Sequence, residues 1–341
     1  MSVFDSSKVA QVETLLASAQ NIAITCHKSP DGDAIGSALG LWQVLRASGF
    51  QAQVVVPDRF PLFLKWMEGA DQCLVADQDE EAALSVLVAA DLVFCLDYND
   101  LTRTGPLTET LRASTAPKVM VDHHQDPDDF AAVQFSDTAS CSTAQMIYEW
   151  VEASGRLEYL STDAMACLYT GIVTDSGSFR FSSVTPETHR IAACMMEHGL
   201  QPHLVHQALF DTNEESRLRL TGYALSEKLQ VWREYCTAVI SLTEAELERF
   251  SYQPGDTEGL VNQALSIKGI RMAAFIKEGN GYVKMSLRSK GTFPVNELAG
   301  THFEGGGHIN AAGGRSDLTL EETLEKFKAI LPQYERQLCA G

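Results

Sequence analysis

The sequence has no long apolar run, and this absence sets the first limits on what the protein can be. A membrane-spanning helix needs about 18 or more consecutive apolar residues, and no such stretch occurs among the 341 residues. The first 20 residues carry charged side chains such as Asp5 and Lys8 at helical spacing, in place of the continuous apolar core of a signal peptide. We therefore expect a soluble cytoplasmic protein that does not bind membranes.

The chain also lacks paired cysteine motifs. Its eight cysteines include no Cys-x-x-Cys pair, and several lie inside apolar runs, where a thiol behaves as a small hydrophobic group. This usage favours a reducing cytoplasm and argues against a zinc ribbon.

Positive charge is scarce, since 26 Lys and Arg stand against 45 Asp and Glu and leave a formal net charge of -19. Binding of long nucleic acid depends on neutralising many phosphates, so this charge disfavours a protein that coats such polymers. A short nucleotide held through divalent ions remains compatible with it. The sequence also has no Walker motif, no G-x-G-x-x-G motif and no nucleophile elbow.

The length and the alternation of elements predict an α/β protein of two domains. A chain of 341 residues is about two domains long. Alternating strands and helices imply right-handed crossovers and a parallel sheet covered on both faces. The expected elements of this first part are helices over 9–19 and 34–48 and strands over 21–26, 51–56, 91–96 and 118–121.

Later segments change to helical spacing and then back to strands. We expect helices over 142–153, 162–174, 186–198 and 202–209, an exposed connecting helix over 213–232, a strand over 235–242 and a hairpin of 270–276 with 281–287. A surface helix of the first domain is the alternative for 213–232. The predicted organisation is a doubly wound, mainly parallel sheet in residues 1–212, a linker over 213–232 and a second, smaller α/β domain in residues 233–341.

One loop between a predicted strand and helix carries an unusual concentration of polar groups, His27, Asp31 and Asp33. Carboxylates this close repel each other, and a metal ion is the simplest remedy. Ordinary turn and helix-capping roles are the alternative. An EF-hand is excluded, because Ile35 and Trp42 occupy positions where that loop requires oxygen ligands.

Three further clusters follow apolar runs in the same way. Asp97 follows the run 91–96, Asp122-His123-His124 ends the run from 118, and Asp175 ends the run 164–174. Parallel strands present their carboxyl ends at one edge of a sheet, so these groups can meet there although they lie far apart in sequence.

This series resembles the four motifs of the DHH phosphoesterase superfamily. His27-x3-Asp31-x-Asp33, a strand-end Asp97, the Asp122-His123-His124 triplet and a later Asp175 occur in the family's order. The C-terminal segment 305–313, Gly-Gly-Gly-His-Ile-Asn-Ala-Ala-Gly, resembles the glycine-rich signature of the DHHA1 domain. Together they are similar to the NrnA-like oligoribonucleases and pAp phosphatases, over nearly the whole chain.

The resemblance implies two divalent metal ions. It assigns His27, Asp31 and Asp97 to one ion, and Asp33, Asp97, His123 and Asp175 to the other, with Asp97 bridging the two. This number of ligands leaves open positions, which a catalytic site needs. Carboxylate and imidazole donors without thiolate favour Mn²⁺, with Mg²⁺ and Co²⁺ as alternatives.

The resemblance also implies residues that contact substrate. His124 is assigned to the substrate phosphate and to protonation of the leaving oxygen, with a packing role as the alternative. Residues 268–290 carry six Lys and Arg against one Glu, and Arg288 among them matches a DHHA1 arginine that binds phosphate. Gly305, Gly306, Gly307 and His308 are expected to cradle phosphate, and Arg180 is a further candidate.

We therefore expect a metal-dependent phosphohydrolase. It would hydrolyse short oligoribonucleotides to mononucleotides, remove the 3′-phosphate of pAp, or do both, using water activated by two metal ions. The alternatives are a phosphodiesterase of pApA or cyclic di-AMP, a polyphosphate or pyrophosphate hydrolase, and a non-catalytic nucleotide sensor. The preferred substrate, the direction of cleavage, the physiological metal and the oligomeric state, with a homodimer among the options, stay open.

Overall fold

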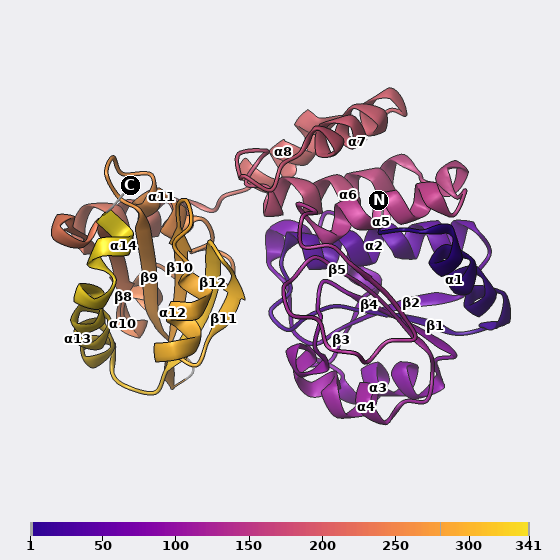
Figure 1. The fold of residues 1–341 in the computed structure, drawn as a ribbon, viewed down its shortest axis with the longest axis horizontal. Helices are drawn as coiled ribbons and strands as arrows, with labels where there is room; N and C mark the ends of the chain where they lie inside the picture. The colour runs from indigo at the N-terminus through magenta and orange to yellow at the C-terminus, as the bar shows by residue number, and fades with distance from the viewer. Residues whose placement is uncertain (1–2, 280, 340–341) are drawn as a thin grey trace. The chain divides into compact units, whose positions relative to one another are not determined.

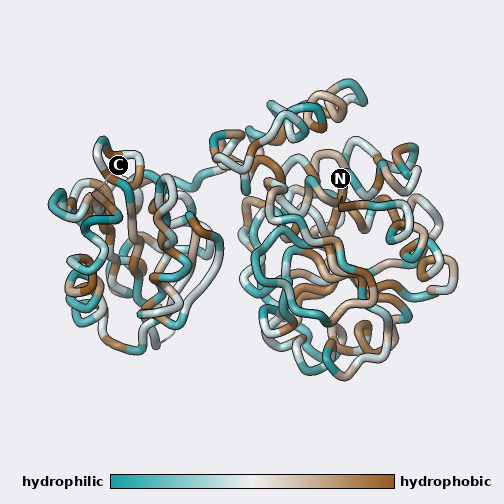
Figure 2. Tube along the Cα trace, viewed as in Figure 1, coloured by the Kyte–Doolittle hydropathy of each residue, from teal (hydrophilic) through white to brown (hydrophobic). Residues whose placement is uncertain are grey.

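The computed structural model describes residues 3–279 and 281–339, and the chain divides after Thr212 into two units (Figure 1). In both units the apolar segments run mainly through the strands and the helix faces that pack on them (Figure 2). No helix among the described residues combines the length and apolarity needed to cross a bilayer.

The first unit contains a six-stranded parallel sheet of order β3-β2-β1-β4-β5-β6. Its central strands are apolar and buried on both faces, as parallel strands in α/β proteins are. The prediction of a doubly wound parallel sheet is confirmed. The strands are β1 (Ile22–Thr25), β2 (Ala52–Val56), β3 (Leu74–Val75), β4 (Leu92–Leu96), β5 (Lys118–Asp122) and β6 (Val133–Ser136).

Helices cover both faces of this sheet (Figure 1). Alternate strand residues feed two cores, so Ile24 and Phe94 belong to the core on one face and Ala23 and Val93 to the core on the other. One face carries α1 (Ser6–Ser18), α2 (Gly32–Ala47), α5 (Thr143–Ala153) and α6 (Thr162–Asp175), with α7 (Pro186–Glu197) and α8 (Pro202–Phe210) packed on α6; the other carries α3 (Glu80–Ala89) and α4 (Thr108–Ala113).

The order of the strands places a topological switch point between β1 and β4. The chain leaves these two neighbouring strands towards opposite sides of the sheet, which opens a crevice at their carboxyl ends. Ligands of open α/β sheets bind at this place.

The second unit is built on a mixed sheet of order β11-β12-β10-β9-β8-β7. Strands β8 and β9 are parallel, and the other pairs are antiparallel, including the predicted hairpin of β9 and β10. The strands are β7 (Leu229–Trp232), β8 (Thr237–Leu242), β9 (Met272–Gly279), β10 (Tyr282–Ser289), β11 (Gly306–His308) and β12 (Ala311–Ser316).

Helices pack on both faces of this second sheet as well. The hydrophobic core on one face includes Phe303 and Phe327, and the core on the other includes Leu247 and Leu260. The first face carries α12 (Val295–His302), α13 (Leu320–Ile330) and α14 (Glu335–Cys339); the second carries α9 (Glu215–Tyr223), α10 (Glu244–Arg249) and α11 (Leu260–Leu265).

The prediction of one exposed helix over 213–232 is wrong. Helix α9 ends at Tyr223, a π-helical turn spans Ala224–Lys228, and β7 then pairs with β8 at the edge of the second sheet. Leu220 is buried in a core of the second unit. The segment therefore belongs to the second unit. Its last residues form a strand because they pair with β8, although their charge pattern is typical of a helix.

A disulfide joins Cys236, in the turn before β8, to Cys339 at the end of α14. The cysteine pattern gives no sign of this pair, because 103 positions separate the two residues and neither lies in a recognisable motif. The other six cysteines are free. The reducing compartment inferred from cysteine usage loses part of its support.

Candidate metal centre

The carboxyl edge of the first sheet gathers the predicted metal-binding residues of the first unit. His27 follows β1, Asp97 follows β4 at the switch point, and His123 follows β5. The start of α2 and the end of α6 supply the remaining carboxylates. The ligand atoms form groups within 4.8 Å: His27, Asp31 and Asp97; Asp33, His123 and Asp175; and Asp97, Asp122 and His124.

The first group centres on the imidazole of His27. Its Nδ1 lies 2.8 Å from the carbonyl oxygen of Lys28, which assigns the Nδ1 proton to that hydrogen bond. Nε2 then faces the carboxylates, 3.3 Å from Asp97 Oδ2 and 3.9 Å from Asp31 Oδ1. A carbonyl behind the ring and carboxylates before it is the usual orientation of a metal-binding histidine.

Asp31 also caps helix α2, because its Oδ1 accepts the backbone N–H groups of Asp33 and Ala34. The capping role weighed from the sequence is therefore real, and it holds the carboxylate beside His27.

His123 is oriented in the same way in the second group. Its Nδ1 lies 3.3 Å from the carbonyl oxygen of Ser140. Its Nε2 lies 3.4 Å from Asp175 Oδ2 and 3.8 Å from Asp33 Oδ2. Two carboxylates thus lie around Nε2 of a buried imidazole.

Asp97 lies between the two groups and faces both. Oδ2 points to His27, while Oδ1 lies 3.6 Å from Nε2 of His123. The hydroxyl of Thr143 donates to Oδ1 at 3.1 Å, and the backbone N–H of Asp97 donates to the carbonyl of Val121. The residue is buried and has a φ of 63°, a left-handed conformation that costs about 1–3 kcal/mol outside glycine. Strain of this kind is typical of a functional position.

Asp33 is held at the amino end of helix α5. Its two oxygens accept the backbone N–H groups of Thr143 at 2.7 Å and Ala144 at 2.8 Å. The positive end of the helix dipole stabilises a carboxylate there.

Glycines let α2 approach α6 closely enough to complete the second group. A methyl group at Gly36 of α2 would lie 2.4 Å from the carbonyl oxygen of Cys167 on α6. One at Gly171 of α6 would lie 2.7 Å from Oδ1 of Asp33. Both helices therefore bring their carboxylates, Asp33 and Asp175, to the same imidazole.

The electrostatics show a site crowded with negative charge. Burial, together with repulsion from Asp97 and Asp175, raises the pKa of Asp33 well above its usual value. Burial also opposes ionisation of Asp97, but its hydrogen bond to His27 and the nearby imidazoles hold its pKa below the usual range.

The two imidazoles respond in the opposite sense to the same charges. Burial favours neutral His27, yet Asp97 and Asp31 outweigh it and raise the pKa of His27 to about 9. The pKa of His123 is raised as well, because Asp175 and Asp97 outweigh burial. The site demands compensating positive charge, and its carboxylate and imidazole donors, without thiolate, fit hard divalent cations.

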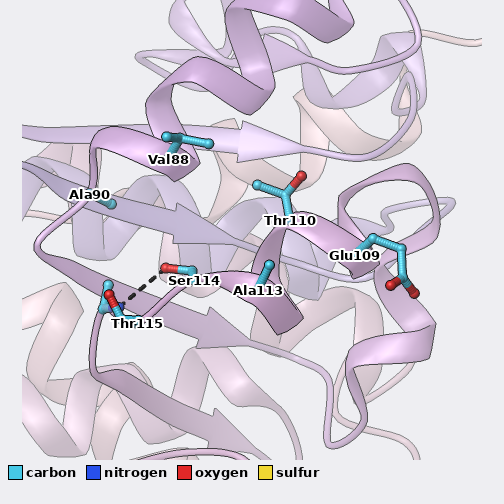
Figure 3. Close-up of a pocket in the computed structure, with 8 residues that line it drawn as sticks. Val88, Ala90, Glu109, Thr110, Ala113, Ser114 and Thr115 are labelled. Carbon is cyan, nitrogen blue, oxygen red and sulfur yellow. Dashed lines mark hydrogen bonds between the residues drawn. The ribbon is translucent and has the colours of Figure 1, made fainter.

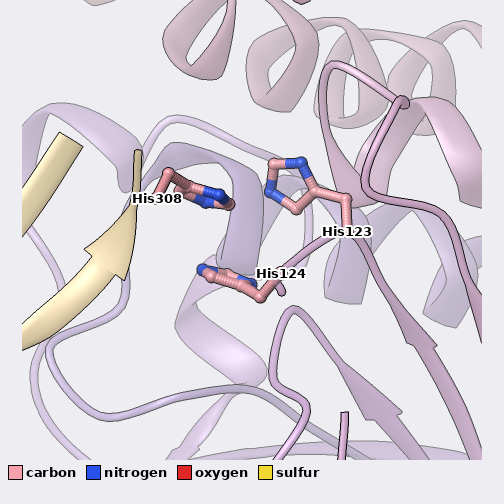
Figure 4. Close-up of side chains that lie close together, drawn as sticks. All are labelled: His123, His124 and His308. Atoms are coloured by element: carbon pink, nitrogen blue, oxygen red, sulfur yellow. The ribbon is translucent and has the colours of Figure 1, made fainter. Parts of the chain in front are cut away.

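The ring of His124 lies edge to face with the ring of His123. The two rings lie 5.0 Å apart at 70° (Figure 4), and His308 in the same figure belongs to β11 of the second unit. Nδ1 of His124 donates to Asp122 Oδ1 at 2.7 Å, and Arg103 donates to Nε2 at 3.1 Å. Sequence reasoning missed Arg103, which lies in the 3-10 helix Leu101–Leu107 and belongs to no recognised motif.

In the second unit, the strand register brings two predicted phosphate-binding residues onto one face. Arg288 of β10 pairs with Ala311 of β12, and Ala311 pairs with His308 of β11. The row Arg288–Ala311–His308 therefore places a guanidinium and an imidazole on either side of a small residue.

The predicted glycine cradle differs in part from the structure. The N–H of Gly305 donates to the carbonyl of Ala299, so this group is already used within the fold. A methyl group at Gly305 would lie 2.1 Å from the carbonyl oxygen of Gly313, and Gly307 has a φ of 137°. These two glycines are needed for close strand packing, and Gly306 is exposed on β11.

A cavity of about 450 Å³ lies apart from these groups (Figure 3). It is lined by Ala90, which precedes β4, and by Thr115 and Ala116, which precede β5. It therefore belongs to the amino edge of the first sheet, opposite the candidate metal centre.

Comparison with known proteins covers both units. Residues 21–172 match the DHH family, N-terminal domain, and residues 235–337 match the DHHA1 domain. The chain is 30% identical to the bifunctional oligoribonuclease and PAP phosphatase NrnA of Thermus thermophilus, over 92% of this chain and 90% of that protein.

Two further comparisons extend this result. The crystal structure of an exopolyphosphatase-related protein from Bacteroides fragilis matches with a TM-score of 0.93 and 38% identity, over 98% of both chains. The cyclic-di-AMP phosphodiesterase GdpP of Geobacillus thermodenitrificans is 25% identical over 94% of this chain but only 48% of its own length.

Proposed function

The chain belongs to the DHH family of phosphoesterases, with a DHH N-terminal domain followed by a DHHA1 domain, and from this premise we propose that it hydrolyses short nucleotides with the help of two divalent metal ions. Its substrates would be short oligoribonucleotides, the 3′-phosphate of pAp, or both. The observation that carries this proposal is the position of Asp97, whose two oxygens face two separate groups of ligands.

Each ligand group would hold one ion. His27, Asp31 and Asp97 would bind the first; Asp33, Asp97, His123 and Asp175 would bind the second. Mn²⁺ is the ion we propose, because the donors mix carboxylate with imidazole. Bound divalent ions would lower the pKa of water and neutralise the charge that develops on the phosphoryl group.

The protein's own groups prepare this chemistry. The carbonyls of Lys28 and Ser140 fix the Nδ1 protons of the two metal-facing imidazoles, so that both present Nε2. The amino end of α5 holds Asp33 in one orientation. Little reorganisation is then required when substrate binds.

His124 and Arg103 supply the remaining roles. Nδ1 of His124 donates its proton to Asp122, while Arg103 donates to Nε2. When Arg103 donates to a substrate phosphate instead, Nε2 becomes available to carry the proton that the leaving oxygen receives. Arg288 and His308 would bind a phosphate group where β10, β12 and β11 lie side by side in the second sheet. A cytoplasmic location and a homodimer stay predictions.

Two other substrates are favoured by a specific comparison. The similarity to a cyclic-di-AMP phosphodiesterase supports hydrolysis of cyclic di-AMP or pApA, although the chain spans about half of that relative. The similarity to an exopolyphosphatase-related protein supports polyphosphate or pyrophosphate. The second candidate is weaker, because the basic C-terminal Ser-Arg-Lys-Lys motif of family II pyrophosphatases is absent.

A product time course with Mn²⁺ distinguishes these substrates. The panel contains pAp, pApA, cyclic di-AMP, a pentanucleotide RNA, an RNA of about two dozen nucleotides and pyrophosphate. We expect rapid turnover of pAp or the short RNAs, slow turnover of the long RNA, and none after removal of metal with EDTA. Full activity of the metal-free protein, or turnover of pyrophosphate alone, would contradict the proposal.

A further inference from the structure

The turn that follows Asp175 has an unusual backbone. Gly177, Ser178 and Phe179 have φ values of 58°, 60° and 61°, so three consecutive residues are left-handed and two of them are not glycine. Such a turn persists only where its surroundings impose it. Here the buried Ser176 does so, since its hydroxyl accepts the N–H of Phe179 and its carbonyl accepts the N–H groups of Arg180 and Phe181.

Phe179 anchors the turn inside the unit. Its ring stacks on His189, with centroids 5.3 Å apart and planes at 21°, and lies 5.9 Å from the ring of Tyr169 on α6. Two sets of contacts therefore hold the turn: the packing of Phe179 on His189 and Tyr169, and the hydrogen bonds to Ser176.

The fixed turn carries an aromatic ring and a cation a few residues after Asp175, a predicted metal ligand. The ring of Phe181 packs against the backbone of Gly177, two residues after Asp175. A methyl group added at Gly177 would lie 2.5 Å from Cζ of this ring. The side chain is nevertheless 39% exposed. The guanidinium of Arg180 lies 5.7 Å from this ring, and its Nε donates to the carbonyl of Gly177 at 3.2 Å.

We propose that Phe181, steadied by Arg180, is a stacking platform for a nucleobase of the substrate. The proposal rests on the proposed function, because it places the base of a nucleotide whose phosphate lies at the metal centre. A base stacks on an aromatic ring whatever its identity, since every base has a π-face. The platform would therefore strengthen binding of all four nucleotides without selecting among them.

The test measures binding and does not require turnover. Isothermal titration calorimetry in Mn²⁺ gives the Kd of AMP and of ribose 5-phosphate, which has the same phosphate and sugar but no base. Wild type should bind AMP at least about 10-fold more tightly than it binds ribose 5-phosphate. Phe181→Leu keeps an apolar side chain over Gly177 but removes the π-face, so it should abolish most of the difference in Kd between AMP and ribose 5-phosphate. Phe181→Trp keeps a π-face and should keep that difference.

Phe210→Leu is the matched control, because it removes a phenylalanine that is 47% exposed on α8 and stacks against His206, which in turn contacts Tyr169. It should leave the difference between the two ligands unchanged. Equal affinity of wild type for AMP and ribose 5-phosphate would overturn the platform. So would equal losses for both ligands in Phe181→Leu, which would indicate a role in folding the turn. A wild type that binds AMP through Phe181 but hydrolyses no nucleotide would refute the proposed function and leave the platform standing.

Discussion

At the scale of single residues, Asp97 is at once strained, buried and negatively charged within the centre. It is left-handed, 2% exposed and directed at two imidazoles by hydrogen bonds from Thr143 and to Val121. A helix cap or a surface turn would not require all of these together. One carboxylate that serves two ions, as we propose, would account for the arrangement.

Replacement of Asp97 by Asn should therefore abolish turnover while the fold remains. The change keeps the shape but removes the charge, and we expect activity to fall by at least about 100-fold. Mn²⁺ should raise the melting temperature of wild type and raise that of the variant much less. Asp91→Asn is the control, because Asp91 accepts backbone N–H groups at an exposed site away from the centre. A variant with wild-type activity and two bound metals would refute the bridging role.

Residues of the centre differ in how far sequence could predict them. The groups at His27, Asp97 and His123 stand out because each follows an apolar run, and parallel strands align the ends of such runs. Arg103 and Thr143 carry no such signal, because they act by a hydrogen bond whose partner only the fold brings near. Register and side-chain orientation decide these contacts.

At the scale of elements, the spacing of glycines on α2 sets the geometry of the centre. Gly36 lies where α2 meets the backbone of α6, and the two helices carry Asp33 and Asp175. The separation of the two helix axes therefore determines how far apart the carboxylates of Asp33 and Asp175 lie.

Gly36→Ala should destabilise the first unit and weaken metal binding together. The added methyl group would lie 2.4 Å from a backbone oxygen, which cannot move alone, and overpacking of this kind costs about 1–3 kcal/mol. The matched control is Gly222→Ala in α9, where no atom lies within 4 Å of the new group and helix propensity improves. Thermal unfolding and Mn²⁺ titration of both variants check this. Wild-type metal affinity in Gly36→Ala would show that the helix contact does not position the ligands.

The segment 213–232 shows which elements the sequence pattern could not predict. The strands of the first sheet follow from apolar runs that suit one buried environment. Residues 213–232 mix charged and apolar positions that suit either a helix or an edge strand. Tertiary contacts select the structure of this segment. Among them, Tyr223 and Lys228 both donate to Glu246 of α10 and attach the segment to the second unit.

This contact predicts an acid-sensitive attachment of α9 to the second unit. Although burial opposes ionisation, the hydrogen bonds from Lys228, the N–H of Thr243 and Tyr223 lower the pKa of Glu246 from 4.5 to about 2. A lowered folded-state pKa stabilises the fold above about pH 4.5, and this contribution is lost as pH falls from about 4.5 to 2. The side chain is 18% exposed, and we expect about 1–3 kcal/mol at pH 7.

Glu246→Gln should lose this stability at pH 7 and differ little from wild type near pH 2. Amide hydrogen exchange in α9 and β8 measures it locally, apart from any protonation of the metal centre. Glu322→Gln is the control, because Glu322 occupies the same capping-box position on α13, where it accepts from the backbone N–H and the hydroxyl of Thr319. An equal effect of both variants would assign the stability to the capping box alone.

At the scale of the whole molecule, the proposed function requires an acidic protein to bind an anionic substrate. The net charge of -19 repels a long polyanion, while the proposed divalent ions and a few cations on the second sheet would attract a short one. On the β12 side of Arg288, the residues on the same face are Ala311 and Gly313, so that strand places no large side chain beside the guanidinium. This contrast predicts selection for short substrates.

Arg288→Ala tests that selection. Loss of a charge-assisted contact should weaken binding of a dinucleotide by about 10- to 100-fold, and metal occupancy should not change. Because the contact would lie away from the reacting phosphorus, KM should rise first, and kcat should fall only if this binding also orients the scissile phosphate. The comparison substrate is bis(p-nitrophenyl) phosphate, a diester too small to need the second unit. Lys290→Ala removes a nearby charge, and it should change neither substrate much, because Lys290 bonds to the carbonyl of Ile270. Equal losses on both substrates in Arg288→Ala would place this arginine in the fold or at the reaction centre, and selection for length would then have to come from the first unit.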